Sequence, residues 1–211
     1  MKKLNVLLAY IFLAGMIACE SPVTFTEPQP PDTGNLAKIP DRLAGKYYSL
    51  ADNSLLTISD NLLVRTYDFD NKMHINDLDS NMRLSGDTLV DLKSHERTIV
   101  IRVGDTLVNH IHATDTVFQL NKDNVLRKFK GYYFLNKRMN DESWEVKKIS
   151  ISRGQITIGS ISSKFDLEKL QEITETSKDT VPPHKFTVTK KQFRKFIRRD
   201  GFSENEIFIR Q

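Results

Sequence analysis

Two histidines, His110 and His112, have the residue type and spacing that could bind a metal ion. They are two apart in a segment of β-favouring residues, so their side chains are expected on the same face of a strand. Such a pair can chelate a transition metal, which needs a third and usually a fourth ligand. His74, His95 and His184 would complete a site only if the fold brought them there. The alternative is a solvated strand face, and we expect no bound metal or other cofactor.

Residues 190–199 form a basic segment with a helical pattern of apolar residues. Phe193, Phe196 and Ile197 are spaced i, i+3, i+4, which places them on one helix face. Six basic residues flank that face: Lys190, Lys191, Arg194, Lys195, Arg198 and Arg199. These charges could contact anionic membrane headgroups, lipopolysaccharide or a polyanionic cell-wall polymer. The alternative is an ordinary surface helix that packs its apolar face on a sheet while its charges are solvated.

Acidic residues cluster around Trp144, where Asp141, Glu142 and Glu145 lie. Paired carboxylates can act as general acid and base when burial raises the pKa of one of them. These residues lie in turn-rich polar sequence, where Asp is favoured for local backbone hydrogen bonds. The chain also lacks a Gly-x-Ser-x-Gly motif and a phosphate-binding glycine loop. The residues therefore favour a non-enzymatic role and leave a hydrolase as an alternative.

The only cysteine of the chain, Cys19, ends an N-terminal segment that is organised like a signal peptide. Lys2 and Lys3 precede an apolar stretch over residues 4–18, which is shorter than the roughly 20 residues of a membrane-spanning helix. Met16-Ile17-Ala18-Cys19 resembles the lipobox of bacterial lipoproteins. The resemblance covers the first nineteen residues only.

The resemblance to bacterial lipoproteins implies cleavage before Cys19 and acylation of its sulfur and of the new amino group. Several acyl chains on one residue give stable membrane attachment, because each buried methylene contributes about 0.8 kcal/mol. Met16 and Ile17 depart from the commonest pattern, Leu followed by a small residue, so an ordinary secretory signal or an uncleaved anchor is the alternative. Asp after the cysteine resembles an inner-membrane retention signal. Glu20 therefore favours the outer membrane and leaves its periplasmic and surface faces open.

The segment that follows the cysteine is rich in proline, with five of the seven prolines of the chain between Glu20 and Pro40. Proline removes a backbone donor and favours an extended conformation in the residue before it. We therefore expect residues 19–40 to be a lipidated cysteine followed by a semi-rigid tether. Removal of residues 1–18 would also take away two lysines, so the formal net charge of +4 does not indicate a nucleic-acid partner.

The remaining sequence, from residue 41, consists mainly of short β-favouring runs separated by turn residues. Gly86-Asp87 and Gly104-Asp105 each precede Thr-Leu-Val, and Arg153-Gly154 separates two runs with alternating isoleucines. Glycine supplies the positive φ of tight hairpin turns. The pattern predicts a mainly β, antiparallel meander or barrel-like fold, for which lipocalins are an analogy at the level of the fold only.

Helices are predicted to be few and short. They are expected at 122–130 after the cap Asn121, at 163–173, and at 190–200 after the cap Thr189. Phe118–Lys122 is similar to Phe186–Lys190, which indicates a duplication with β-rich units at 41–130 and 131–211, the second ending in the basic helix and a strand. One continuous β-domain is the alternative.

The leading functional expectation is a lipid-anchored protein of the bacterial cell envelope that acts as a non-catalytic interaction module for an envelope protein or polymer. The alternatives are a carrier of a small apolar ligand and an envelope hydrolase. A carrier requires a cavity of about 300–1,000 Å³ lined by aromatic residues. A hydrolase requires convergent acids or a nucleophile in a cleft. An interaction module should expose an apolar patch or an open strand edge.

Overall fold

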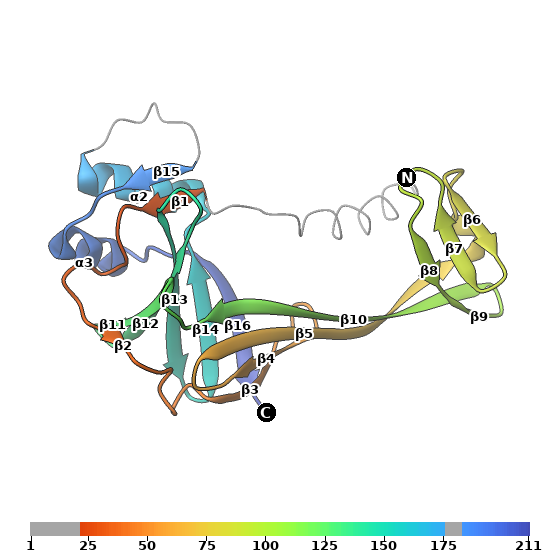
Figure 1. Cartoon of the computed structure of the whole chain (residues 1–211), viewed down its shortest axis with the longest axis horizontal. Helices are drawn as coiled ribbons and strands as arrows, with labels where there is room; N and C mark the ends of the chain where they lie inside the picture. Colours follow the sequence, from red (N-terminus) through yellow and green to blue (C-terminus); the bar gives the residue numbers. More distant parts are fainter. Residues whose placement is uncertain (1–21, 176–182) are drawn as a thin grey trace. The chain divides into compact units, whose positions relative to one another are not determined.

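The computed structural model describes residues 22–175 and 183–211 (Figure 1). The described chain forms two compact units. Unit 1 comprises residues 67–113, and unit 2 comprises the described residues before and after this insertion. The predicted signal peptide and Cys19 lie outside the described residues. None of the described helices is long and apolar enough to cross a membrane.

Unit 2 is built on one antiparallel sheet. Its strands are β2 (Asn35–Leu36), β3 (Gly45–Tyr48), β4 (Ser54–Ile58), β11 (Asn124–Phe129), β12 (Tyr132–Arg138), β13 (Trp144–Ser152), β14 (Gln155–Ser160) and β16 (Glu204–Arg210), together with the parts of β5 (Leu62–His74) and β10 (Thr106–Gln119) that lie in this unit. The order is β2-β11-β12-β13-β14-β16-β3-β4-β5-β10. The prediction of a mainly β, antiparallel fold is therefore confirmed, and the described strands do not close into a barrel.

Strand β16 joins two parts of this sheet that are distant in the sequence. Its Ile207 pairs with Thr157 in β14, and its Ile209 pairs with Tyr48 in β3. On the path through the sheet, β3 and β4 are thus connected to β12–β14 by β16. Strands from both predicted units, 41–130 and 131–211, consequently share one sheet.

The sheet is buried on both faces at β12, where Tyr132 to Leu135 form a continuous apolar run. Tyr133 and Leu135 point into a core that also contains Tyr47 and Phe208. Phe134 points the opposite way, into a second core. A strand that is covered on both faces is expected to be apolar throughout rather than alternating.

An outer layer covers the second face of the sheet (Figure 1). It consists of β1 (Val23–Phe25), β15 (His184–Phe186), α2 (Lys164–Thr174) and α3 (Lys190–Arg198). Val23 pairs with His184 of β15, and Phe25 pairs with Trp144 of β13. The rings of Phe25 and Phe193 lie 6.2 Å apart, so β1 packs directly against α3.

The proline-rich segment differs from the expected tether over residues 19–40, because its described part belongs to unit 2. Phe25 is completely buried. Side chains of the neighbouring strands bind the carbonyl groups of the proline-rich turn: Asn136 Nδ2 donates to Gln29 O (3.0 Å) and Arg127 Nη1 donates to Pro30 O (2.7 Å). Because these donors satisfy the backbone, the turn at 28–31 can be largely buried although it is neither helix nor strand. The folded body therefore includes residues 22–40.

The prediction of a helix at 122–130 is wrong, because this segment contains strand β11. Lys130 and Gly131, with φ of +51° and +87°, make a two-residue hairpin turn that pairs β11 with β12. Tertiary pairing here overrides the helical propensity of a Lys-rich sequence. The other two predicted helices are present as α2 and α3. The two similar segments, 118–122 and 186–190, are thus followed by a strand in one case and by a helix in the other, so their similarity lends the duplication no support.

Unit 1 contains the hairpins that the two Gly-Asp motifs predict. Its elements are a 3-10 helix (Ile75–Asp77), β6 (Met82–Ser85), β7 (Thr88–Asp91), β8 (Arg97–Ile99), β9 (Ile101–Val103) and the remaining parts of β5 and β10. Gly86 and Gly104 have φ of +63° and +61° in the β6–β7 and β9–β10 turns. Leu89, Val100 and Leu107 form a small separate core. The two compact units therefore meet on either side of this insertion, at residues 66/67 and 113/114.

Candidate functional site

Helix α3, which carries the predicted basic segment, is fixed in place by its cap and its apolar face. Thr189 N donates to Gln192 Oε1 (2.8 Å), and Gln192 N donates to Thr189 Oγ1 (3.2 Å), which makes a reciprocal capping box. Phe193 and Phe196 are completely buried in the outer-layer core, and Ile197 is partly buried there. The predicted apolar face therefore packs on the sheet.

The six predicted basic residues separate into two groups. Lys191, Arg194, Lys195 and Arg198 are spaced i, i+3, i+4, i+7, which aligns them along one side of α3. Arg194 is half-exposed and the other three are exposed. Within the described chain none of the four forms an ion pair. We call these four residues the α3 basic face.

The other two basic residues of the segment are held by unit 2 itself. Lys190 Nζ donates to Asp32 O (2.7 Å) and lies over the ring of Phe129. Arg199 Nη1 forms an ion pair with Glu172 Oε2 of α2 (2.7 Å). The hydrogen bond and charge of Arg199 lower the pKa of Glu172. Lys190 and Arg199 therefore serve the packing of α3 rather than an outward surface.

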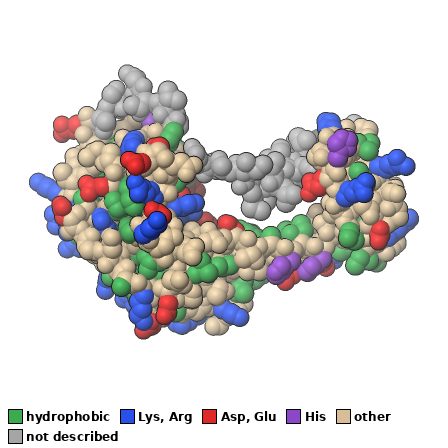
Figure 2. Space-filling view, in the orientation of Figure 1, with side chains coloured by type: hydrophobic (Ala, Val, Ile, Leu, Met, Phe, Trp, Pro, Cys, Tyr) green, Lys and Arg blue, Asp and Glu red, His purple; other side chains and the backbone are tan. Residues whose placement is uncertain are grey.

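His110 and His112 lie on the surface of unit 1 beside two carboxylates of β5. His110 Nδ1 lies 3.1 Å from Asp70 Oδ1, and His112 Nδ1 lies 3.4 Å from Asp68 Oδ2. Figure 2 shows histidine side chains exposed on this unit with acidic side chains next to them. Over residues 22–175 and 183–211, no three His, Cys, Asp or Glu side chains are arranged to hold a metal ion. His74, His95 and His184 are not brought to this pair.

An apolar row runs along the edge of unit 1. Ile99, Ile101 and Val103 are 72%, 67% and 63% exposed; Ile99 ends β8 of the small β6–β8 sheet, whereas Ile101 and Val103 share one face of β9. Strand β9, which carries Ile101 and Val103, is the last strand of its sheet, and no described strand pairs with its other edge. An edge of this kind is a template for pairing with another chain. The alternation in the sequence is the signal that could have revealed this row.

The expected cavity of a ligand carrier would be lined by aromatic residues, but in the described part of unit 2 Tyr47, Tyr133 and Phe134 line neither of the two recesses given below. Tyr47, Tyr133 and Phe134 are buried core side chains. One recess of about 360 Å³ is open and lined by loop residues such as Asn61 and Asn121. A second, of about 170 Å³, is lined mainly by charged strand residues, including Arg65, Lys137, Glu145, Lys147 and Glu206. Neither recess has the enclosed aromatic lining that an apolar ligand requires.

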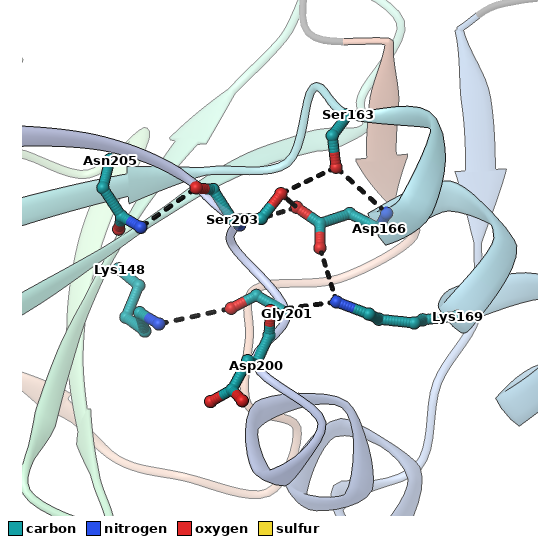
Figure 3. A network of polar contacts seen from close by, with 8 residues as sticks. All are labelled: Lys148, Ser163, Asp166, Lys169, Asp200, Gly201, Ser203 and Asn205. Carbon is teal, nitrogen blue, oxygen red and sulfur yellow. Dashed lines mark hydrogen bonds and ion pairs between the residues drawn. The ribbon is translucent and has the colours of Figure 1, made fainter.

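A polar network in the outer layer centres on Asp166, a residue that sequence reasoning missed (Figure 3). Its buried carboxylate accepts hydrogen bonds from Ser203 N (2.7 Å) and Ser203 Oγ (2.9 Å). Ser163 Oγ caps α2 by accepting from Asp166 N (3.1 Å) and lies 2.7 Å from Ser203 Oγ. Lys169 Nζ contacts Asp166 Oδ1 at 3.5 Å. Ser163-x-x-Asp166 is a local capping signal, whereas the bond to Ser203 depends on the fold.

The Asp166 network combines hydroxyl, carboxylate and amine groups, which are the groups used in nucleophilic catalysis. Its geometry instead links α2 to the segment between α3 and β16. Lys169 Nζ also donates to Asp200 O (3.1 Å), and Lys148 Nζ donates to Gly201 O (3.2 Å). Burial lowers the pKa of Lys148. Neither recess described above is lined by these residues, so the network acts as a connection between elements.

Two of the acidic residues around Trp144, Asp141 and Glu142, contact nearby residues of the same turn, and Asp141 also pairs with Lys185 (3.8 Å). Asp141 Oδ1 accepts from Ser143 N (3.0 Å), and hydrogen bonds from Ser143 lower the pKa of Asp141. Glu142 pairs with Arg138 (3.1 Å). A general acid needs a raised pKa, and Asp141 has the opposite shift. The arrangement agrees with a turn rather than with a pair of catalytic carboxylates.

Comparison with known proteins gives no relative, since no family model, curated protein or solved structure matches this chain. The surfaces of the chain are therefore the basis for any functional proposal.

Proposed function

We propose that the protein is a lipid-anchored component of the bacterial cell envelope that acts as a non-catalytic interaction module. The anchor is supported by the position of the sole cysteine, Cys19, directly after a signal-like apolar segment. The placement of the body is compatible with an anchor at Cys19, because Pro22, three residues further on, already accepts a hydrogen bond from His184 N of β15 (2.8 Å). The outer membrane is the proposed location, on the basis of Glu20.

The exposed row of Ile99, Ile101 and Val103 is the observation that carries the interaction role. Burial of apolar surface contributes about 25 cal/mol per Å², so an uncovered row on a strand edge favours association. The partner proposed is an extended polypeptide segment of an envelope protein. Such a segment would pair its backbone with β9 while its apolar side chains cover the row.

The anchor is tested by labelling cells with an alkyne analogue of palmitate. We expect the wild-type protein to take up the label and to sediment with membranes. Cys19→Ala should be unlabelled, because the only thiol that can receive a lipid is gone. A wild-type protein that carries no label, or that is freely soluble with residues 1–18 still attached, would contradict the proposal.

The interaction surface is tested with a photo-crosslinking amino acid placed at Ile101 in intact cells. Ser85, which is exposed on β6 of the same unit, is the matched control position. We expect a discrete adduct from position 101 only, and its loss when Ile99 and Val103 are both replaced by Lys. Equal crosslinking at positions 101 and 85, or an adduct that survives both lysines, would argue against the row as the binding surface.

A further inference from the structure

We propose that the α3 basic face binds the anionic lipid headgroups of the membrane that holds the anchor, and thereby orients unit 2 with its outer layer against the bilayer. This inference rests on the lipid anchor proposed above. The partner is a lipid surface, recognised through the negative charge of its phosphate groups.

The first support is the length of chain between the anchor and the body. Three residue steps separate Cys19 from Pro22. At 3.3–3.6 Å per extended residue they span at most about 11 Å. Pro22 leads directly into β1 of the outer layer, and Pro22 O accepts a hydrogen bond from His184 N of β15 (2.8 Å). The link therefore holds the outer layer close to the headgroups.

The second support is the charge of the helix that lies in this layer. The four residues of the α3 basic face extend along about 10 Å of helix, at 1.5 Å per residue. Each is free of ion pairs within the described chain. Glu172 of α2 forms its ion pair with Arg199, although the charge of Lys195 also lowers the pKa of Glu172. A row of cations that form no ion pair is complementary to a surface of phosphate groups.

The buried apolar face defines how the helix can bind. Phe193 and Phe196 are completely buried in the outer-layer core, so α3 cannot insert them between acyl chains as an amphipathic membrane helix does. Attraction must come from charge alone, and it extends over about one screening length from the surface. A short covalent link compensates for this weakness, because it keeps the helix at high effective concentration near the lipid.

The binding step is tested with the mature chain carrying Cys19→Ala, so that no anchor contributes. Its partitioning is measured by co-sedimentation with vesicles of phosphatidylcholine alone and with an equimolar mixture of phosphatidylcholine and phosphatidylglycerol, at low salt. Each cation near an anionic surface is expected to contribute about fivefold in partitioning. Replacing Lys191, Arg194, Lys195 and Arg198 by Gln should therefore remove most of the preference for the mixed vesicles, by on the order of a hundredfold or more. At 1 M salt, where the screening length is about 3 Å, the wild type should also lose its preference for the mixed vesicles.

The matched control neutralises four exposed cations of unit 1, by Lys72→Gln, Arg83→Gln, Lys93→Gln and Arg97→Gln. It changes the net charge by the same amount and should retain nearly all of the partitioning. Gln keeps the helical propensity of α3, and unchanged thermal unfolding would show that the fold is intact. An equal loss in both variants, or wild-type partitioning in the α3 variant, would overturn the proposal.

The orientation is tested with versions of the wild type, the α3 variant and the unit 1 control that retain Cys19, each coupled through the Cys19 thiol to a maleimide lipid in the vesicle. Trp144, the only tryptophan, pairs with Phe25 of the outer layer and serves as a fluorescence donor to dansyl-labelled headgroups. We expect more energy transfer in mixed vesicles than in phosphatidylcholine, and loss of this difference in the α3 variant alone. The same transfer in both vesicle types would overturn the orientation. Because coupling supplies the anchor, this outcome is distinct from a failure of lipidation in cells.

Discussion

Gly201 lies directly against the ring of Phe196, so closely that a Cβ atom at this position would be 2.4 Å from Phe196 Cζ. The ring cannot move aside, because Phe196 is completely buried and packs against Phe202 with centroids 5.4 Å apart. Gly201 N also donates to Phe196 O (3.1 Å), which ends α3. The chain can thus turn from α3 toward β16 only where no side chain is present.

Gly201→Ala is therefore expected to lower the free energy of unfolding by about 1–3 kcal/mol, the usual cost of overpacking. Urea unfolding followed by circular dichroism measures the change. Gly34→Ala is the control, since nothing lies within 4 Å of a Cβ at Gly34, and it should stay within about 0.5 kcal/mol of the wild type. Similar free energies of unfolding for the two variants would show that the close approach of Gly201 to Phe196 does not affect stability.

Asp166→Ala is expected to destabilise unit 2 by about 1–3 kcal/mol, because it removes the buried carboxylate that accepts from Ser203 N and Ser203 Oγ. Asp166→Asn should cost less, since its amide oxygen can still accept from Ser203 N. The control is Glu168→Ala on the exposed side of α2, where the pair with Lys164 is 3.8 Å long and solvated. Denaturant unfolding of the three variants gives the comparison. An Asp166→Ala protein as stable as Glu168→Ala would remove the structural role of the network.

Asp52 makes the stability of unit 2 depend on pH. Burial raises the pKa of Asp52, but hydrogen bonds from Ser49 and Ser54, with the charge of Arg65, outweigh this effect and hold the pKa below its ordinary value of 3.8. A carboxylate with a lowered pKa in the folded state stabilises the fold above its unfolded pKa and loses this contribution as the pH falls through its folded pKa.

Asp52→Asn should therefore reduce the free energy of unfolding at neutral pH. Its difference from the wild type should shrink as the pH falls below about 4. Urea unfolding at a series of pH values measures both curves. A difference that is constant across the series would mean that the lost stability comes from packing rather than from charge.

Leu107→Ala is expected to open unit 1 while unit 2 stays folded. Leu107 is one of three fully buried residues in the core of unit 1, and large-to-small changes in a core cost about 2–5 kcal/mol. Hydrogen exchange read by mass spectrometry should show loss of protection in β7 and β8 and unchanged protection in β12 and β13. The reciprocal change, Leu56→Ala in the core of unit 2, should act on β3 and β4. Loss of protection throughout the chain from Leu107→Ala would show that the two units unfold together.

The parts of the fold that could be predicted from the sequence are those with local causes. The turns at Gly86, Gly104 and Gly154 require positive φ, and each one joins two paired strands as expected. Thr189 caps α3 through its own neighbour Gln192. In each case the residues that produce the structure are adjacent in the chain.

The parts that could not be predicted depend on residues far apart in the chain. The segment 122–130 becomes a strand because β12 is beside it, and the proline-rich turn is buried because Arg127 and Asn136 supply donors about a hundred residues away. The same holds for the basic helix. Spacing alone aligns its four outward cations, whereas the removal of Arg199 from that surface depends on Glu172 of another helix.

The position of β16 has a consequence for how the protein acquires its fold during synthesis. The sheet of unit 2 becomes continuous only after residues 204–210 have been inserted between β14 and β3. A ribosome must therefore translate residues 204–210 before β3, an early strand, can reach one of its final neighbours. Pairings between such distant residues form slowly, so the nascent polypeptide stays open for longer than one built from local hairpins alone.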